Sequence, residues 1–100
     1  MNAKDPTGRT ALHVATIKGL LDLVRILVSE GADTNAVDGD GIAALHYAVW
    51  EGRADLARFL LAAGADINVR DRRGLTPAWY AARLGHPEVA ELLTRRGAKD

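Results

Sequence analysis

Residues 5–37 read DPTGRTALHVATIKGLLDLVRILVSEGADTNAV, and this pattern returns twice at an interval of 33 residues without a gap. A fixed period of this length indicates a repeat protein, in which each unit packs on its neighbours. We expect one domain over residues 1–100, with units at about 5–37, 38–70 and 71–100. The residues that are identical in all three units are Asp5, Asp38 and Asp71; Gly8, Gly41 and Gly74; Ala15, Ala48 and Ala81; Gly19, Gly52 and Gly85; Leu27, Leu60 and Leu93; Gly31, Gly64 and Gly97; and Ala32, Ala65 and Ala98.

Each unit predicts a pair of helices, because a turn rich in Asp and Gly precedes a short helical pattern, a glycine and a longer amphipathic pattern. Thr10 suits the start of the first helix, since its hydroxyl can accept from a free amide of the first turn. Gly19 follows that helix, where a left-handed residue is needed. The second helix is expected over about residues 21–30, with Asp22 and Arg25 on its wet side and an apolar stripe at Leu23, Val24, Ile26, Leu27 and Val28. Together the units predict an all-α solenoid of stacked helix-turn-helix units.

Composition excludes several classes of partner and site. The chain has 13 basic and 13 acidic residues, so no global positive field attracts nucleic acid or an anionic membrane. No apolar stretch approaches the roughly 20 residues that span a bilayer. The absence of cysteine rules out disulfides and thiolate sites and is compatible with a reducing compartment. We therefore expect a cytoplasmic or nuclear protein with no nucleic-acid partner and no membrane partner.

Short motifs in each unit resemble those of the ankyrin family. TALHVA at 10–15, AALHYA at 43–48 and TPAWYA at 76–81 are similar to its TPLHxA signature, and GADTNA at 31–36 and GADINV at 64–69 are similar to its loop. The resemblance covers nearly the whole chain. It implies an L-shaped layer with two rows of antiparallel helices and hairpin-like loops that project as fingers. It also implies a non-catalytic protein-interaction scaffold that binds its partner on a concave groove.

The chain departs from the signature at several positions. Only the third unit has the proline, Pro77, so the first turns of the other units lose a preset φ angle. The second unit has Ala43 in place of the threonine, and the resemblance implies that His46 then lacks its usual hydrogen-bond partner. Trp79 replaces the histidine in the third unit, where we expect it to have a structural role.

The two ends of the chain differ from the middle. Residues 2–4 match the close of a preceding unit, which leaves open a start within a loop or a longer array. Thr94, Arg95 and Arg96 take the places held by Val28, Ser29 and Glu30 in the first unit and by Leu61, Ala62 and Ala63 in the second. We expect these polar residues to form a C-terminal cap.

No group of residues predicts catalysis, a cofactor site or a metal site, so we expect a chain that is not an enzyme. His13 and His46 recur at one place in successive units, which favours a structural role in the turn over metal binding. His86 is expected to be a surface or capping residue. The expected helix-surface pairs are Asp22 with Arg25, Asp55 with Arg58, and Glu91 with Arg95.

The concave side, which the resemblance implies as the binding surface, consists of finger tips and the exposed side of the first helices. Trp50 and Ile42 are large apolar residues at positions that the fold does not need buried, so we expect them to anchor a partner. The alternative is that Trp50 folds over the groove between layers, and core packing is also expected for Tyr47 and Tyr80. The predicted partner-binding residues are Arg9, Ile17, Lys18, Asp40, Ile42, Trp50, Glu51, Arg70, Arg72, Arg73, Leu75 and Arg83.

Charge is uneven along the stack, because the third unit has six basic and four acidic residues. Arg70, Arg72, Arg73 and Arg83 are expected to lie close together on its finger and first helix. They would pair with an acidic or phosphorylated segment, unless they form only a solvated loop. We expect a monomer that binds a protein or peptide partner.

Three alternatives remain open at the level of sequence. The chain could be a designed or evolved ankyrin binder, or a regulatory fragment of a larger protein whose catalytic domain is absent. The family resemblance also implies that Asn35 and Asn68, in the loops, are candidate sites of hydroxylation.

Overall fold

A computed structural model describes residues 2–98, which form six short helices in three pairs. The first helices of the pairs begin at Ala11, Ala44 and Pro77, so successive pairs are 33 residues apart, as the repeat predicts. The helices are α1 (Ala11–Ile17), α2 (Leu21–Ser29), α3 (Ala44–Trp50), α4 (Ala54–Ala62), α5 (Pro77–Leu84) and α6 (Pro87–Arg95). Outside the helices of this part of the chain, one isolated antiparallel bridge joins Val37 to Ala43. The prediction of an all-α solenoid is confirmed.

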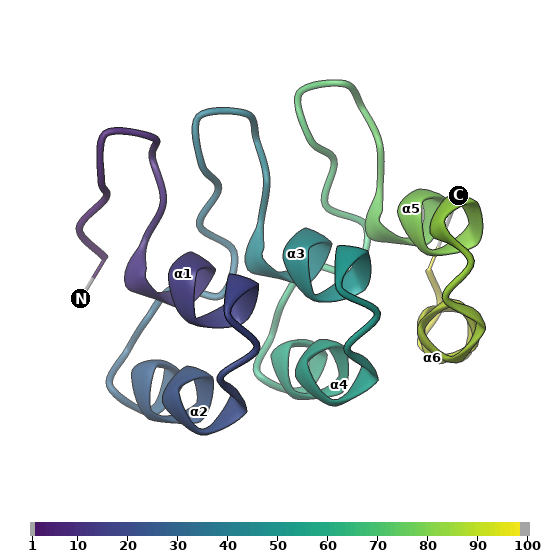
Figure 1. The fold of residues 1–100 in the computed structure, drawn as a ribbon, viewed down its shortest axis with the longest axis horizontal. Coiled ribbons are helices and arrows are strands. Elements are labelled where there is room, and N and C mark those ends of the chain that lie inside the picture. The colour runs from purple at the N-terminus through teal and green to yellow at the C-terminus, as the bar shows by residue number, and fades with distance from the viewer. Residues whose placement is uncertain (1, 99–100) are drawn as a thin grey trace.

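The helices form two rows. Figure 1 shows α1, α3 and α5 side by side in one row and α2, α4 and α6 in the other. The loops that precede α1, α3 and α5 project from the first row as three parallel fingers (Figure 1). Met1, which precedes the predicted first unit, and Lys99 and Asp100, which end the predicted third unit, lie outside the described residues.

Thr10 and Thr76 start α1 and α5 as the sequence predicts. The hydroxyl of Thr10 accepts from His13 N at 3.4 Å, and that of Thr76 accepts from Trp79 N at 3.3 Å. The helix α3 begins at the same register without a side-chain cap, since Ala43 has no hydroxyl. The first helices of all three units begin at equivalent residues, Ala11, Ala44 and Pro77. The missing prolines of the first two units therefore do not move the start of the helix.

As expected, His46 lacks the hydroxyl contact that Thr10 makes with His13, but His46 still has two hydrogen-bond partners. Its Nδ1 accepts from the backbone N–H of Ala43 at 3.2 Å, so the proton is on Nε2, which donates to the carbonyl oxygen of Leu75 at 3.1 Å. His13 makes the same two bonds, to Thr10 N and to the carbonyl oxygen of Ile42. Each histidine thus fastens the first turn of its helix to the finger of the next unit, and loss of the threonine removes only a side-chain contact.

The core lies between the two rows and between successive units. Its largest fully buried apolar residues are Leu12, Val24, Leu45, Val49, Leu56, Leu60, Val89 and Leu93. Ala15, Ala48 and Ala81 are at most 1% exposed, which confirms that small residues allow close contact between the layers.

The predicted apolar stripe of α2 is only partly buried. Val24 is fully buried, but Leu23 is 41% and Ile26 is 56% exposed. Leu56, which occupies the position of Leu23 in the second unit, is 0% exposed because the first unit covers it. No helix among the described residues covers the same face of α2, so burial of this position depends on a preceding unit.

Asn2 makes the same hydrogen bond to the first unit that Asn35 makes to the second. The side-chain oxygen of Asn2 accepts from Asp33 N at 2.9 Å, and that of Asn35 accepts from Asp66 N at 2.7 Å. The match between residues 2–4 and the close of a unit therefore extends to the hydrogen bonds.

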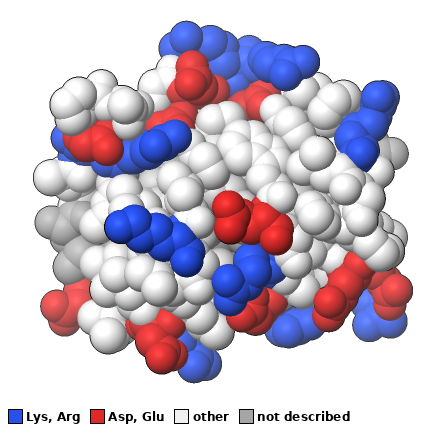
Figure 2. Space-filling model, in the orientation of Figure 1, with Lys and Arg blue, Asp and Glu red and all other residues white. Residues whose placement is uncertain are grey.

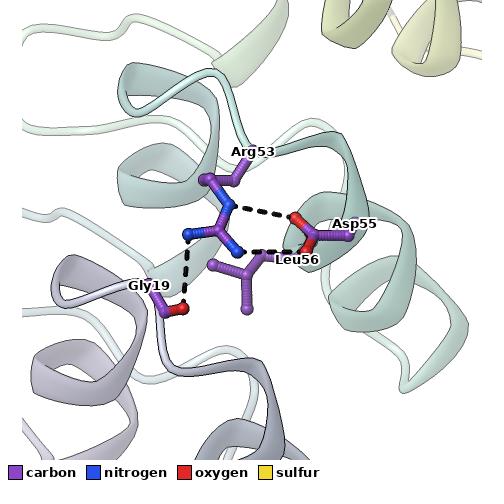
Figure 3. Close-up of polar contacts among 4 residues, drawn as sticks. All are labelled: Gly19, Arg53, Asp55 and Leu56. Atoms are coloured by element: carbon purple, nitrogen blue, oxygen red, sulfur yellow. Dashed lines mark hydrogen bonds and ion pairs between the residues drawn. The ribbon is translucent and has the colours of Figure 1, made fainter.

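Arg53 links the first two units. Figure 3 shows its guanidinium between the backbone oxygen of Gly19 and the carboxylate of Asp55. It donates to Gly19 O at 3.2 Å and to both Asp55 oxygens, at 3.2 and 3.0 Å. The hydrogen bonds from Arg53, which outweigh burial, hold the pKa of Asp55 below its ordinary value of 3.8. The expected partner of Asp55 was Arg58, so that prediction is wrong.

The other two predicted pairs have different outcomes. Glu91 and Arg95 form the expected ion pair at 2.5 Å. Within residues 2–98 Asp22 forms no ion pair, and the guanidinium of Arg25 instead lies 5.6 Å from the centre of the Phe59 ring in the next unit. A contact between units is thus preferred here over one along the helix surface.

His86 was expected to be a surface or capping residue, and it occupies the N-cap position of α6, although its side chain makes no capping hydrogen bond there. Its Nε2 lies 3.2 Å from the backbone oxygen of Trp50, at the end of α3. His86 occupies the same position in the third unit as Arg53 in the second, and each side chain reaches a backbone oxygen at or just beyond the end of the preceding first helix. Within residues 2–98 no helix has the length and apolar character needed to cross a membrane.

Candidate interaction site

A pocket of about 380 Å³ opens between the second and third units, beside their fingers. All three units contribute to it. Its lining residues are Arg9, Asp40, Ile42, Tyr47, Trp50, Asp71, Arg72, Arg73 and Tyr80.

Three aromatic rings form the floor of the pocket. Trp50, in the last turn of α3, lies between Tyr47 and Tyr80, with ring centres 5.0 and 5.1 Å away. Both contacts are edge-to-face, at interplanar angles of 90° and 86°, which is a favourable arrangement for aromatic pairs. Trp50 is half-buried: it packs against both tyrosines and keeps part of its surface exposed.

The two tyrosines are fixed by the aspartate that begins each finger. Tyr47 donates to Asp38 Oδ2 at 2.7 Å, and Tyr80 donates a short hydrogen bond to Asp71 Oδ2. The other oxygen of each carboxylate accepts two backbone N–H groups of its own finger, at 2.9 to 3.0 Å; for Asp71 these belong to Arg73 and Leu75. The repeated aspartate therefore shapes the finger and orients the ring at once.

These hydrogen bonds perturb the titration of both partners. Burial acts to raise the pKa of Asp71, but the bonds from Tyr80 and from the backbone outweigh it and leave that pKa below 3.8. The same balance lowers the pKa of Asp38. Burial and the neighbouring Asp71 carboxylate raise the pKa of Tyr80 to about 12. At neutral pH the pocket therefore contains an ionised aspartate and a neutral tyrosine.

Arginines form the rim of the pocket. Figure 2 shows Lys and Arg side chains gathered along the edge where Figure 1 places the fingers, with acidic side chains beside them. Arg72 donates its backbone N–H to Asp40 O at 3.0 Å and a side-chain N–H to Gly39 O at 2.6 Å. Arg9 lies over Tyr47, with its guanidinium carbon 5.6 Å from the ring centre. The Nε of Arg9 is buried, and no acceptor among residues 2–98 bonds to it.

Comparison with protein families identifies the repeat. A family model described as "Ankyrin repeats (3 copies)" matches residues 1–71, and one described as "Ankyrin repeats (many copies)" matches residues 51–94. The chain belongs to the ankyrin repeat family. Ankyrin repeats are in general protein–protein interaction modules, and ankyrin domains are typically non-catalytic. A search of curated proteins found no match to the sequence.

The ankyrin fold brings half of the predicted partner-binding residues into one pocket. Arg9, Asp40, Ile42, Trp50, Arg72 and Arg73 line it, whereas Ile17, Lys18, Glu51, Arg70, Leu75 and Arg83 do not. Of the four arginines expected to lie close together, only Arg72 and Arg73 line the pocket. Arg83 lies on α5, with its guanidinium 4.6 Å from the centre of the Trp79 ring.

Ile42 is not the exposed anchor that the sequence suggested. It is only 7% exposed, and its backbone is held from two sides. Its N–H donates to Asp38 and its carbonyl oxygen accepts from Asp38 N and from His13 Nε2. Ile42 contributes to the wall of the pocket but has little surface to offer a partner.

Sequence reasoning missed three lining residues of this ankyrin pocket: Tyr47, Tyr80 and Asp71. The signal was present, since Tyr47 and Trp50 are three residues apart on one helix and therefore share a face. Tyr80 has the same register as Tyr47 in the next unit. Only the packing shows that the rings of two units meet at Trp50.

Proposed function

We propose that this chain is a non-catalytic interaction module that binds a protein or peptide across the pocket between its second and third units. One observation carries the proposal: a partly exposed tryptophan between two tyrosines, with arginines on the rim. Tryptophan, tyrosine and arginine are the residues most enriched at the energetic centres of protein interfaces. Three arginines against two aspartates in the lining favour a partner with an acidic segment.

The proposal extends to the state and location of the chain. It acts as a monomer in the cytoplasm or nucleus, which fits a sequence without cysteine. Exposed residues outside the pocket, such as Lys18, Glu51 and Arg83, would form a polar surround to the central contact.

The test is an affinity capture with variants of the rim. The immobilised chain is compared with the double variant Arg72→Glu, Arg73→Glu, and retained proteins are identified by mass spectrometry. Both arginines are exposed, so we expect circular dichroism to show an unchanged helical content. The double variant Arg58→Glu, Arg96→Glu carries the same change in charge at exposed positions outside the pocket and is the matched control.

We expect the control to retain the proteins that the unchanged chain retains, and the rim variant to lose them. Recovery of the same proteins by the rim variant would overturn the assignment of the pocket. Failure of the unchanged chain to retain any protein above a blank matrix would overturn the interaction function itself.

A further inference from the structure

This inference rests on the proposed function and concerns the chemistry of the segment that occupies the pocket. The aromatic floor is rigid, because Tyr47 and Tyr80 are fixed at their hydroxyls and Trp50 is held between the two rings. A volume of about 380 Å³ is at the small end of the range for ligand pockets. It suits one large apolar side chain, with the adjoining backbone lying across the rim.

Cationic groups flank this floor from both ends of the stack. Arg9 belongs to the first unit, whereas Arg72 and Arg73 belong to the third, so an occupant meets them on opposite sides. Arg9 is half-buried, with its guanidinium over the Tyr47 ring. Because a guanidinium is always charged, its terminal nitrogens can donate charge-assisted hydrogen bonds to a carboxylate of an occupant.

The two carboxylates in the lining differ in what they offer an occupant. Asp71 is 6% exposed and its oxygens already accept from Tyr80, Arg73 N and Leu75 N. Asp40 is exposed and is therefore the acidic group that an occupant meets. The Asp40 carboxylate repels an acidic group of the occupant at one place on the rim. The arginines attract acidic groups at the two ends of the pocket.

We infer that the pocket binds an extended peptide segment in which one apolar or aromatic side chain is flanked on both sides by carboxylates. The apolar side chain rests on Trp50. One carboxylate pairs with Arg9 and the other with Arg72 and Arg73.

Fluorescence anisotropy with defined peptides tests this arrangement. The probe is a labelled peptide with one phenylalanine between pairs of glutamates, and its relatives have lysines for the glutamates, glycine for the phenylalanine, or glutamates on one side only. The protein variants are Arg9→Gln, the double variant Arg72→Gln, Arg73→Gln, and Asp40→Asn, with Arg58→Gln, Arg96→Gln as the control. Circular dichroism confirms that each variant is folded.

We expect the glutamate peptide to bind at least about tenfold more tightly than the lysine and glycine peptides. Arg9→Gln and the Arg72, Arg73 pair should each weaken its binding about tenfold, Asp40→Asn should tighten it about threefold, and the control should have no effect. A peptide with glutamates on one side should be sensitive to only one of the two arginine changes.

Equal binding of the lysine peptide, or no binding of the glutamate peptide to the folded chain, would overturn the inference. The inference would also be overturned if the binding of a peptide with glutamates on one side only were weakened equally by Arg9→Gln and by the double variant Arg72→Gln, Arg73→Gln. These outcomes leave the proposed function standing if the rim variant still loses proteins in the capture experiment, so the two failures can be told apart.

Discussion

The aspartate that begins each unit has the same role in its own finger but a different side-chain partner in each unit. Asp5 accepts from the hydroxyl of Thr7 at 2.6 Å, whereas Asp38 and Asp71 accept from Tyr47 and Tyr80. The first unit has Val14 at the tyrosine position and so cannot link its finger to its helix in this way. The repeated aspartate therefore connects its finger to the pocket floor only in the second and third units, where a tyrosine is present.

The ionisation of Tyr80 provides a test of this link. Its pKa is raised to about 12, first by burial and then by Asp71, from an ordinary value of 10.0. Because the folded state favours the neutral phenol, this group stabilises the fold below pH 10, and the contribution is lost as the pH rises towards about 12. In an alkaline absorbance titration, Tyr80→Phe should remove the tyrosinate step near about pH 12, and Tyr47→Phe should keep it. A step that survives in Tyr80→Phe would contradict this assignment.

The buried histidines provide a second test at low pH. Burial lowers the pKa of His13 and of His46 below the ordinary 6.5, and both are neutral in the fold. The unfolded chain binds protons first, so stability is full above pH 6.5 and decreases as the pH falls below it. Chemical denaturation should show a lower free energy of unfolding at about pH 5 than at about pH 7.

The loss of stability caused by protonation of the histidines occurs at a higher pH than the loss caused by protonation of the aspartates. Asp38 and Asp71 have lowered pKa values, so their contribution is lost only as the pH falls below 3.8. Proton NMR of the imidazole rings identifies the residues, and a midpoint above 6.5 for His13 or His46 would contradict the prediction.

The fingers are elements that touch one another through their backbones. Gly39 N donates to Thr7 O at 3.1 Å, and Arg72 N donates to Asp40 O at 3.0 Å. Glycine permits this approach, because a Cβ on Gly41 would lie 2.8 Å from Arg72 N. At Gly74, the equivalent position in the third unit, a Cβ would meet nothing within 4 Å.

Alanine at these two glycines separates backbone strain from the contact between fingers. Both have positive φ angles, +76° and +79°, so each change to alanine costs about 1 kcal/mol for the left-handed conformation. Gly41→Ala should lower the free energy of unfolding by at least about 1 kcal/mol more, since the Cβ must displace the next finger. Equal losses in chemical denaturation of the two variants would show that the contact between fingers carries no strain.

In the whole molecule, burial of a residue depends on which unit it belongs to. Leu23 and Leu56 occupy equivalent positions, yet Leu23 is 41% and Leu56 is 0% exposed. Leu56→Ala should lower the free energy of unfolding by about 2–5 kcal/mol because it leaves a cavity between units. Leu23→Ala should lower it by less than about 1 kcal/mol, because the side chain is open to solvent. Denaturant titration measures both, and comparable losses would mean that the outer face of α2 is covered in solution.

Much of the fold was predictable because it follows from local rules that recur with the repeat. Thr10 and Thr76 begin helices by capping, Gly19 ends one in the left-handed conformation with a φ of 71°, and the repeated alanines lie where layers touch. Each of these features depends on residues a few positions away or on the equivalent residue of the next unit. The periodicity carries that information directly.

The candidate site was less predictable, because its side chains choose partners across units. The types of residue were foreseen, but Arg83 stacks on Trp79, Arg53 reaches Gly19, and Ile42 is buried. A long side chain has several partners within reach, and its rotamer depends on packing that no sequence interval reports.

The sequence by itself determined the number of units, the positions of the helices and the position of each buried alanine, since each of these repeats with the period. Only the tertiary structure decided that Trp50 lies between the tyrosines of two units and that Arg9 faces Arg72 and Arg73 across them. The physical reason is that the period specifies which backbones are neighbours, whereas the pocket depends on how unlike side chains from three units fill the space between them.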